Sequence, residues 1–185
     1  MKCFLCDYEG NMEIKSSVEN RNIFKCPNCS VQFMLPQTSD KELNEIYSNK
    51  NYPTCSFDKG SENEIIKMKR KTFKSILKKI LPYCNSGNIL DIGCSSGILL
   101  EEAQNLGFNP YGVEISEYAS SIAKKRIGED KIHNGSLENI PFKKNYFSLI
   151  TMIDVIEHVR NPIEILSKSS EYLNITTNSN RGGIA

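Results

Sequence analysis

The stretch that decides the fold is residues 89–100, which read Ile-Leu-Asp-Ile-Gly-Cys-Ser-Ser-Gly-Ile-Leu-Leu. An apolar strand is expected here to pass through a turn of small residues into a helix. Small residues let a ligand approach the backbone closely, and the first turn of a helix offers unpaired N–H groups with a partial positive charge. The turn therefore predicts a site for a carboxylate or a phosphate. Neither the dinucleotide pattern G-x-G-x-x-G nor the phosphate-loop pattern is present.

Strands and helices are expected to alternate on both sides of this turn. The apolar periodicity predicts a helix over 62–81, followed by strands at 88–92, 110–115, 130–133 and 146–153 and helices at 97–106, 117–127 and 162–173. Alternation of this kind predicts an α/β fold with a Rossmann-like, doubly wound and mostly parallel sheet. Glu114 ends the second strand, 23 residues after Asp91. A carboxylate at that place can accept both hydroxyls of a ribose.

Four motifs in this order resemble those of class I methyltransferases that use S-adenosylmethionine. Residues 91–97 resemble the first motif, an acid followed by G-x-G-x-G, with Ser95 in place of the middle glycine. Residues 113–116, 135–142 and 146–159 resemble the motifs that follow. The resemblance implies that S-adenosylmethionine is the cofactor. It also implies that the methionine part is held by Asp91, Gly93, Ser95 and Gly97, the ribose by Glu114, and the adenine by Ser136 and Leu137.

Two side chains after the last predicted strand are candidates for catalysis. Asp154 and His158 follow residues 146–153, at the carboxyl end of the sheet, where ligands of such folds bind. An imidazole can accept a proton from a hydroxyl or a carbon acid near neutral pH. The alternative is that Glu157 and His158 only clamp the loop.

Four cysteines near the N-terminus predict a metal centre. Cys3 and Cys6 form one C-x-x-C pair, Cys26 and Cys29 form another, and 19 residues separate the pairs. Two such knuckles facing each other give the four-sulfur site that zinc prefers, and four thiolates leave no position open for a reacting water. We therefore expect a small structural zinc ribbon over 1–36, a connector over 37–61 with a short helix near 41–47, and the methyltransferase domain over 62–185.

Composition narrows the class of acceptor. The net charge of +1 argues against a strongly basic nucleic-acid binder. No membrane span or signal peptide is evident, so we expect a cytoplasmic protein. Proteins with this arrangement of ribbon and sheet resemble enzymes that act on sugars and polysaccharides, so a small-molecule or glycan acceptor is expected. One alternative is an RNA methyltransferase that uses the lysine-rich stretch 67–79, and another is an inactive form that serves only as a zinc-ribbon binding module.

The C-terminal residues predict an incomplete sheet. The family's sheet has seven strands, whereas four are evident in this sequence. Residues 181–185 resemble the glycine turn that leads into the next strand, or residues 175–177 are a stub of that strand. A fourth strand with an unpaired edge invites self-association. We therefore expect a C-terminally truncated catalytic domain that is poorly soluble and weakly active.

Overall fold

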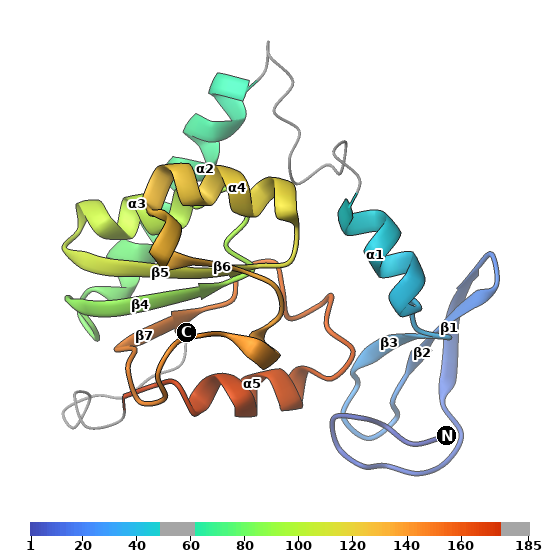
Figure 1. Ribbon diagram of the computed structural model, residues 1–185. Coiled ribbons are helices and arrows are strands. Elements are labelled where there is room, and N and C mark those ends of the chain that lie inside the picture. Colours follow the sequence, from blue (N-terminus) through green and yellow to red (C-terminus); the bar gives the residue numbers. More distant parts are fainter. Residues whose placement is uncertain (49–61, 175–185) are drawn as a thin grey trace.

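The computed structural model describes residues 1–48 and 62–174, and within them it forms two sheets (Figure 1). The first sheet is antiparallel and contains β1 (Glu13–Val18), β2 (Arg21–Lys25) and β3 (Gln32–Leu35). The second is parallel and contains β4 (Gly87–Ile92), β5 (Phe108–Glu114), β6 (Ile132–Asn134) and β7 (Leu149–Thr151). The helices are α1 (Asp40–Ser48), α2 (Glu62–Ile80), α3 (Ile98–Asn105), α4 (Glu117–Ile127) and α5 (Pro162–Ser170), with short 3₁₀ turns η2 (Glu129–Lys131) and η3 (Leu137–Asn139).

The parallel sheet is doubly wound, as the sequence predicts. Its strand order is β6-β5-β4-β7. From β4 the chain moves outward through β5 to β6 and then crosses back to the opposite side of β4, where it forms β7. The order therefore reverses beside β4, and ligands of such sheets bind at the carboxyl ends of the strands at this switch point. The glycine turn predicted from the sequence lies there, directly after β4.

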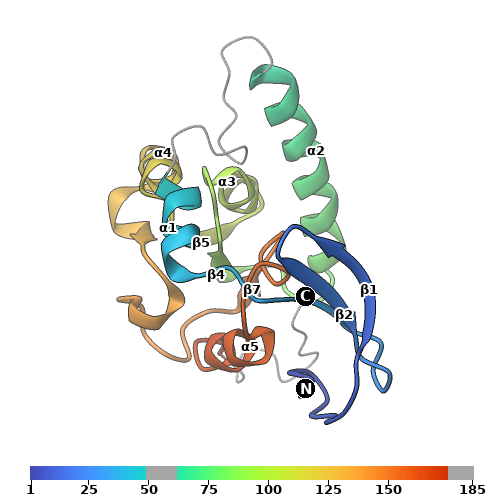
Figure 2. The ribbon, with the colours of Figure 1, turned by 90° about the vertical axis from the view of Figure 1, so that its right-hand side faces the viewer.

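Helices cover both faces of this sheet, and each face has its own apolar core. Alternate residues of a strand point to opposite faces. Ile89 of β4 packs in the cluster under α2, α3 and α4, whereas its neighbour Leu90 packs in the cluster on the other face, together with Phe147 and Ile165. Figure 2 shows these layers end-on, with α2, α3 and α4 on one side of the strands and α5 on the other.

Two of the predicted strands are shorter in the structure, whereas β5 begins two residues before the strand predicted at 110–115 and ends one residue before its end. The strand predicted at 130–133 begins only at Ile132, because the exposed residues Glu129 and Asp130 form the turn η2 instead. The strand predicted at 146–153 forms a regular ladder only over β7, where Leu149 to Thr151 pair with Ile89 to Asp91. Before it, the Ser148 N–H donates to the Asn88 carbonyl at 2.8 Å, and after it the chain bends at Ile153 and Asp154. Residue periodicity shows apolar character, but it does not show where a run of ladder pairs ends.

The end of the described chain runs beside the start of β7. Leu173 forms an isolated parallel bridge with Phe147, and the Asn174 N–H donates to the Phe147 carbonyl at 2.7 Å. The stub predicted at 175–177 and the glycine turn predicted at 181–185 lie outside the described residues. The bridge therefore stands directly before the segment for which a further strand was predicted.

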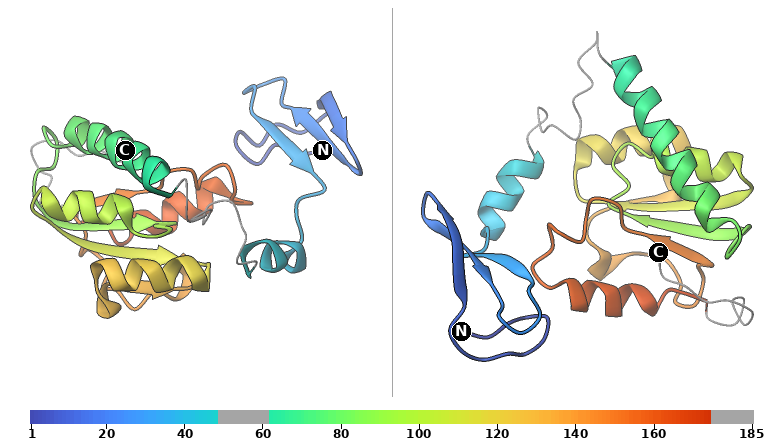
Figure 3. Two further views of the ribbon diagram at one scale, coloured as in Figure 1. Left: turned by 90° about the horizontal axis from the view of Figure 1, so that it is seen from above. Right: turned by 180° about the vertical axis from the view of Figure 1, so that it is seen from behind.

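The antiparallel sheet stands beside the loop that leads from β7 into α5, as both views of Figure 3 show. Helix α1 follows this sheet and confirms the short helix expected near 41–47. Two hydrogen bonds join this part of the chain to the loop. Arg160 Nη2 donates to the Thr38 carbonyl at 2.7 Å, and Gln37 Nε2 donates to the Arg160 carbonyl at 3.3 Å.

Candidate cofactor site and metal centre

The glycine turn is a sharp bend whose backbone is held against β5. The N–H groups of Gly93 and Cys94 both donate to the Val113 carbonyl, at 2.8 and 3.1 Å. Gly93 has a φ of 76°, and a Cβ atom on it would stand 2.4 Å from Val155 Cγ2. Glycine is thus required at position 93 both by the left-handed backbone and by the closeness of the loop after β7.

Gly97 has a different task in the same turn. Its φ is also 76°, and it occupies the N-cap position of α3. A Cβ atom there would stand 3.3 Å from the backbone of Ala123 on α4. Gly97 therefore allows the start of α3 to pack closely against α4, and it does not line the cavity described below.

Glu114 ties the end of β5 to the glycine turn. Its Oε2 accepts a hydrogen bond from the Ser95 N–H and its Oε1 accepts one from the Ser116 N–H, both at 2.8 Å. The side chain is buried, and burial raises the pKa of this carboxyl, although the backbone N–H groups of Ser116 and Ser95 oppose that rise. The sequence predicted a ribose-binding acid here but not its bond to the turn, which no spacing pattern signals.

Asp91 lies beneath the turn and is almost fully buried. Its Oδ1 accepts a hydrogen bond from the Thr151 hydroxyl at 2.7 Å. Burial raises the pKa of Asp91 to about 7; the Thr151 hydroxyl opposes this rise and the charge of Glu114 adds to it. The sequence alone did not single out Thr151, because threonine is common in strands and its place in an apolar strand signals no contact with Asp91.

A cavity of about 450 Å³ opens at the carboxyl ends of β4, β5 and β7. Nine residues were predicted to bind the cofactor or to take part in catalysis. Seven of them line this cavity, whereas Asp91 and Gly97 lie outside its wall. The seven are Gly93, Ser95, Glu114, Ser136, Leu137, Asp154 and His158. The structure therefore brings together residues from four separate motifs around one space, within the size range of small-molecule sites.

The wall of this cavity suits a nucleoside joined to an amino acid. Glu114 supplies a carboxylate, and Ile115 and Leu137 supply apolar surface. The Ser95 hydroxyl oxygen is buried without a hydrogen-bond partner among the described residues. A buried polar atom of this kind calls for a ligand or a water, because leaving it unpaired costs free energy. The donor set thus fits S-adenosylmethionine, which carries ribose hydroxyls, an adenine ring and an amino-acid end.

The four N-terminal cysteines meet at one point, as their spacing predicts. Their sulfur atoms lie within 4.8 Å of one another, with Cys3 and Cys29 3.7 Å apart and Cys6 and Cys26 3.6 Å apart. Four sulfurs bound tetrahedrally at about 2.3 Å from zinc would have edges of roughly 3.8 Å. The cluster therefore has the size of a four-sulfur zinc site, and Cys3 and Cys26 are fully buried in it.

The two halves of the cluster repeat the same backbone turn. The Cys3 N–H donates to the Tyr8 carbonyl and the Asp7 N–H donates back to the Cys3 carbonyl, at 2.9 and 3.1 Å. Cys26 makes the equivalent pair of bonds with Val31 and Ser30, at 2.9 and 3.0 Å. Asp7 and Ser30, which are equivalent in the two turns, both have a positive φ. Two matching knuckles present their thiols to one centre, as the predicted ribbon requires.

The family model described as "Methyltransferase domain" matches residues 66–177. The chain belongs to this methyltransferase family. The match covers about three fifths of the chain and begins within α2, so the antiparallel sheet lies outside it. Together with the doubly wound sheet and the motifs, it identifies the C-terminal part as a class I S-adenosylmethionine-dependent methyltransferase fold.

Named relatives match the same part of this methyltransferase. The mitochondrial ubiquinone biosynthesis O-methyltransferase of Schizosaccharomyces pombe is 39% identical over 90 residues, which cover 45% of this chain and 33% of the relative. The ubiquinone biosynthesis O-methyltransferase of Nitrosococcus oceani is 30% identical over 90 residues, with 46% and 38% covered. The chain thus spans about a third of the length of the curated relatives it matches.

Solved structures agree on the fold. Magnesium protoporphyrin IX methyltransferase of Synechocystis PCC 6803 superimposes with a TM-score of 0.57 at 15% identity, over 74% of this methyltransferase and 68% of that chain. A methyltransferase described as S-adenosylmethionine-dependent from Methanococcus maripaludis gives a TM-score of 0.51 at 24% identity, over 62% of this chain and 58% of that chain.

The helices of residues 1–48 and 62–174 include none with the length and apolar character that a membrane span requires.

Proposed function

We propose that this methyltransferase transfers a methyl group from S-adenosylmethionine to a small-molecule acceptor. The observation that carries the proposal is the cavity at the switch point, where Glu114 and the glycine turn are joined by the Ser95 N–H. The names of the ubiquinone-biosynthesis relatives, which refer to O-methylation of a small molecule, support it. No relative reported above is named for a sugar, so a glycan acceptor rests on the sequence resemblance alone.

The residues of this chain would mainly bind and orient. Glu114 would accept hydrogen bonds from the ribose hydroxyls with the lone pairs that Ser95 and Ser116 leave open, while Gly93 lets the backbone approach the amino-acid end. Leu137 and Ile115 would exclude water from the adenine. When bound, S-adenosylmethionine supplies a methyl group on a cationic sulfur, and the carbon–sulfur bond breaks with its electron pair on sulfur as the bond to the acceptor forms.

The loop after β7 would supply the proton acceptor. His158 is exposed and lines the cavity, and its backbone N–H donates to the Val155 carbonyl at 2.9 Å. We propose that its imidazole takes the proton from an acceptor hydroxyl as that oxygen gains the methyl group. Asp154, whose φ is 55°, stands at the other end of the same loop and would orient the imidazole or the acceptor.

Calorimetry with S-adenosylhomocysteine tests the cofactor site. Glu114→Gln keeps the size of the side chain but loses its charge, and a charged hydrogen bond is worth about 1.5–3 kcal/mol, so the affinity should fall roughly 10- to 100-fold. Glu117→Gln, an exposed carboxylate in the first turn of α4, is the matched control and should bind normally. Equal affinity in the two variants would place the ribose elsewhere. If the wild-type protein does not bind S-adenosylhomocysteine at all, the alternative function, a non-catalytic zinc-ribbon binding module, is favoured.

We further propose that residues 1–36 form a ribbon around one structural zinc ion, that 37–61 connect it, and that 62–185 belong to the methyltransferase domain. The matching knuckles and the sulfur distances support the metal. Metal analysis of the purified protein should give one zinc per chain. The double variant Cys26→Ser, Cys29→Ser should lose it, whereas Cys84→Ser, a cysteine of the other part, should retain it. Zinc that survives the double substitution would refute the assignment.

The lysine-rich helix α2 is the basis of the competing RNA function. Part of it has a structural task, because Arg70 binds Glu101 and Glu102 of α3 and Lys74 lies 3.3 Å from Glu102. Lys67, Lys71 and Lys78 are exposed, and together with Arg70 and Lys74 they line a groove along α2. A labelled-methyl assay with phenols, sugar nucleotides and bulk RNA distinguishes the acceptors, and labelled RNA alone would reverse our preference.

A further inference from the structure

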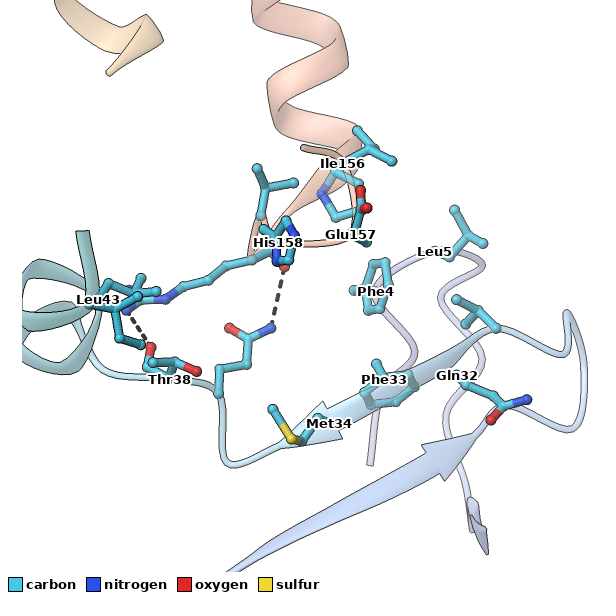
Figure 4. Close-up of a pocket in the computed structure, with 16 residues that line it drawn as sticks. Phe4, Leu5, Gln32, Phe33, Met34, Thr38, Leu43, Ile156, Glu157 and His158 are labelled. Atoms are coloured by element: carbon cyan, nitrogen blue, oxygen red, sulfur yellow. Dashed lines mark hydrogen bonds between the residues drawn. The ribbon is translucent and has the colours of Figure 1, made fainter. Parts of the chain in front are cut away.

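A second cavity, of about 510 Å³, lies between the ribbon and the loop after β7 (Figure 4). One wall comes from the ribbon, with Phe4, Leu5, Phe33 and Met34 among its residues. The opposite wall is the part of that loop from Ile156 to Arg160. The segment that enters α1 forms a third side. The cavity therefore has walls from both parts of the chain, and neither part encloses it alone.

This second cavity adjoins the cofactor cavity. Four residues line both spaces, and they are Leu43, His158, Val159 and Arg160. Figure 4 shows His158 on the loop above the ribbon, with Leu43 on one side of it and Phe4 on the other. A molecule in the second cavity would thus reach the imidazole next to the cofactor. That is the position a methyl acceptor must occupy.

The lining of the second cavity is mainly apolar. Ten of its sixteen residues are apolar, and all three charged or imidazole side chains (Glu157, His158 and Arg160) come from the loop after β7. On the ribbon side the rings of Phe4 and Phe33 meet edge to face, with centroids 5.4 Å apart. Leu5 and Met34 are 46% and 38% exposed. Apolar side chains gathered and exposed around one hollow indicate a ligand or partner.

Continuity with the cofactor cavity decides which occupant fits. We propose that the second cavity is the acceptor site and that it binds a small molecule with an apolar, ring-sized body. The ribbon face covers the body, and the polar end reaches His158. A sugar would place several hydroxyls against Phe4, Phe33 and Met34 without partners, and each unpaired hydroxyl costs free energy. This assignment rests on the proposed function, because it takes the first cavity as the cofactor site.

The test uses the whole zinc-loaded chain and N-phenyl-1-naphthylamine, a neutral aromatic probe whose fluorescence rises in apolar sites. The wild type should bind one probe per chain saturably. Met34→Asp should weaken binding at least tenfold, since an ionised carboxylate in the wall keeps its water and excludes the probe. Leu5→Asp, on the other side of the ribbon wall, should do the same. Val18→Asp is the matched control: Val18 is 59% exposed on β1, outside the cavity, and should change affinity less than twofold.

Calorimetry with S-adenosylhomocysteine on the same variants separates the two proposals. Met34→Asp should bind it as the wild type does, and a saturating amount should leave the probe in place. Unweakened probe binding in Met34→Asp and Leu5→Asp, or displacement of the probe by S-adenosylhomocysteine, would overturn the acceptor site while the cofactor site stands. The acceptor site is also wrong if light scattering shows a dimer that Met34→Asp dissociates and that excludes the probe. Failure of the wild type to bind S-adenosylhomocysteine would instead refute the proposed function.

Discussion

Replacing Asp91 by asparagine should have opposite effects on stability and on cofactor affinity. Asp91 is only 4% exposed, and burial raises the pKa of its carboxyl from the ordinary value of 3.8 to about 7. Between these two pH values the folded protein holds a proton that the unfolded chain has released. Stability therefore falls as the pH rises through this window, and the loss is complete above about pH 7.

The size of this loss follows from the same pKa. At about 1.36 kcal/mol for each pH unit, the window from 3.8 to about 7 corresponds to roughly 4 kcal/mol. An asparagine at this position would have no proton to lose, and its amide oxygen can still accept the Thr151 hydroxyl. Asp91→Asn should therefore melt roughly 10 °C above the wild type at pH 8, because 1 kcal/mol moves the melting temperature of a chain this long by about 2–4 °C.

Thermal melts between pH 4 and 8 without cofactor measure the effect. The wild type should lose stability relative to Asp91→Asn as the pH rises, and the two should converge near pH 4. Asp130→Asn, an exposed aspartate on η2, is the control and should follow the wild type. Calorimetry at pH 8 should show S-adenosylmethionine bound roughly tenfold more weakly by Asp91→Asn, because the charge of Asp91, behind the cavity wall, would attract the ammonium group of the cofactor's amino-acid end. Parallel melting curves for all three proteins would refute the burial argument.

Three other perturbations have defined outcomes. Gly93→Ala should abolish cofactor binding in calorimetry, because the new Cβ would meet Val155. At Gly107 the φ is also positive but no atom stands near the place of a Cβ, so Gly107→Ala should only lower the free energy of unfolding by about 1–2 kcal/mol in thermal melts. Glu102→Gln should cost about 1–3 kcal/mol in urea unfolding, since it removes the buried carboxylate that pairs with Arg70 and Lys74. Chelation of the metal should remove the ribbon's circular-dichroism signal and leave S-adenosylhomocysteine affinity unchanged; a parallel loss of affinity would contradict independent folding of the ribbon.

The sequence predicts the parallel sheet well because its signals are local and strong. β4 and the turn after it combine a buried apolar run, small residues and an acid, and Glu114 falls at the end of β5 as expected. Seven predicted site residues meet at one cavity because each lies at the end of a parallel strand or in the loop that follows it, and parallel strands end together. The topology thus converts positions along the chain into neighbours in space.

What the sequence does not reveal depends on contacts between distant elements. The bond from the Ser95 N–H to Glu114 and that from Thr151 to Asp91 join residues that are 19 and 60 positions apart. The strand β1 is exposed at all six positions and has only two apolar residues, Ile14 and Val18, so its alternation is too weak to detect. It forms because the hairpin with β2 and the cysteine knuckles hold it. The second cavity escaped prediction for the same reason, since its walls come from opposite ends of the chain.

The junction between the ribbon and the loop after β7 has a consequence for engineering. The two hydrogen bonds described there end on backbone carbonyls, those of Thr38 and Arg160, and every residue type carries such an acceptor. Gln37, Thr38 and Arg160 all lie outside residues 1–36, so both bonds remain when a foreign ribbon replaces residues 1–36. Chimeras in which residues 1–36 are replaced by another zinc ribbon should therefore assemble, and their choice of methyl acceptor should change with the exchanged ribbon.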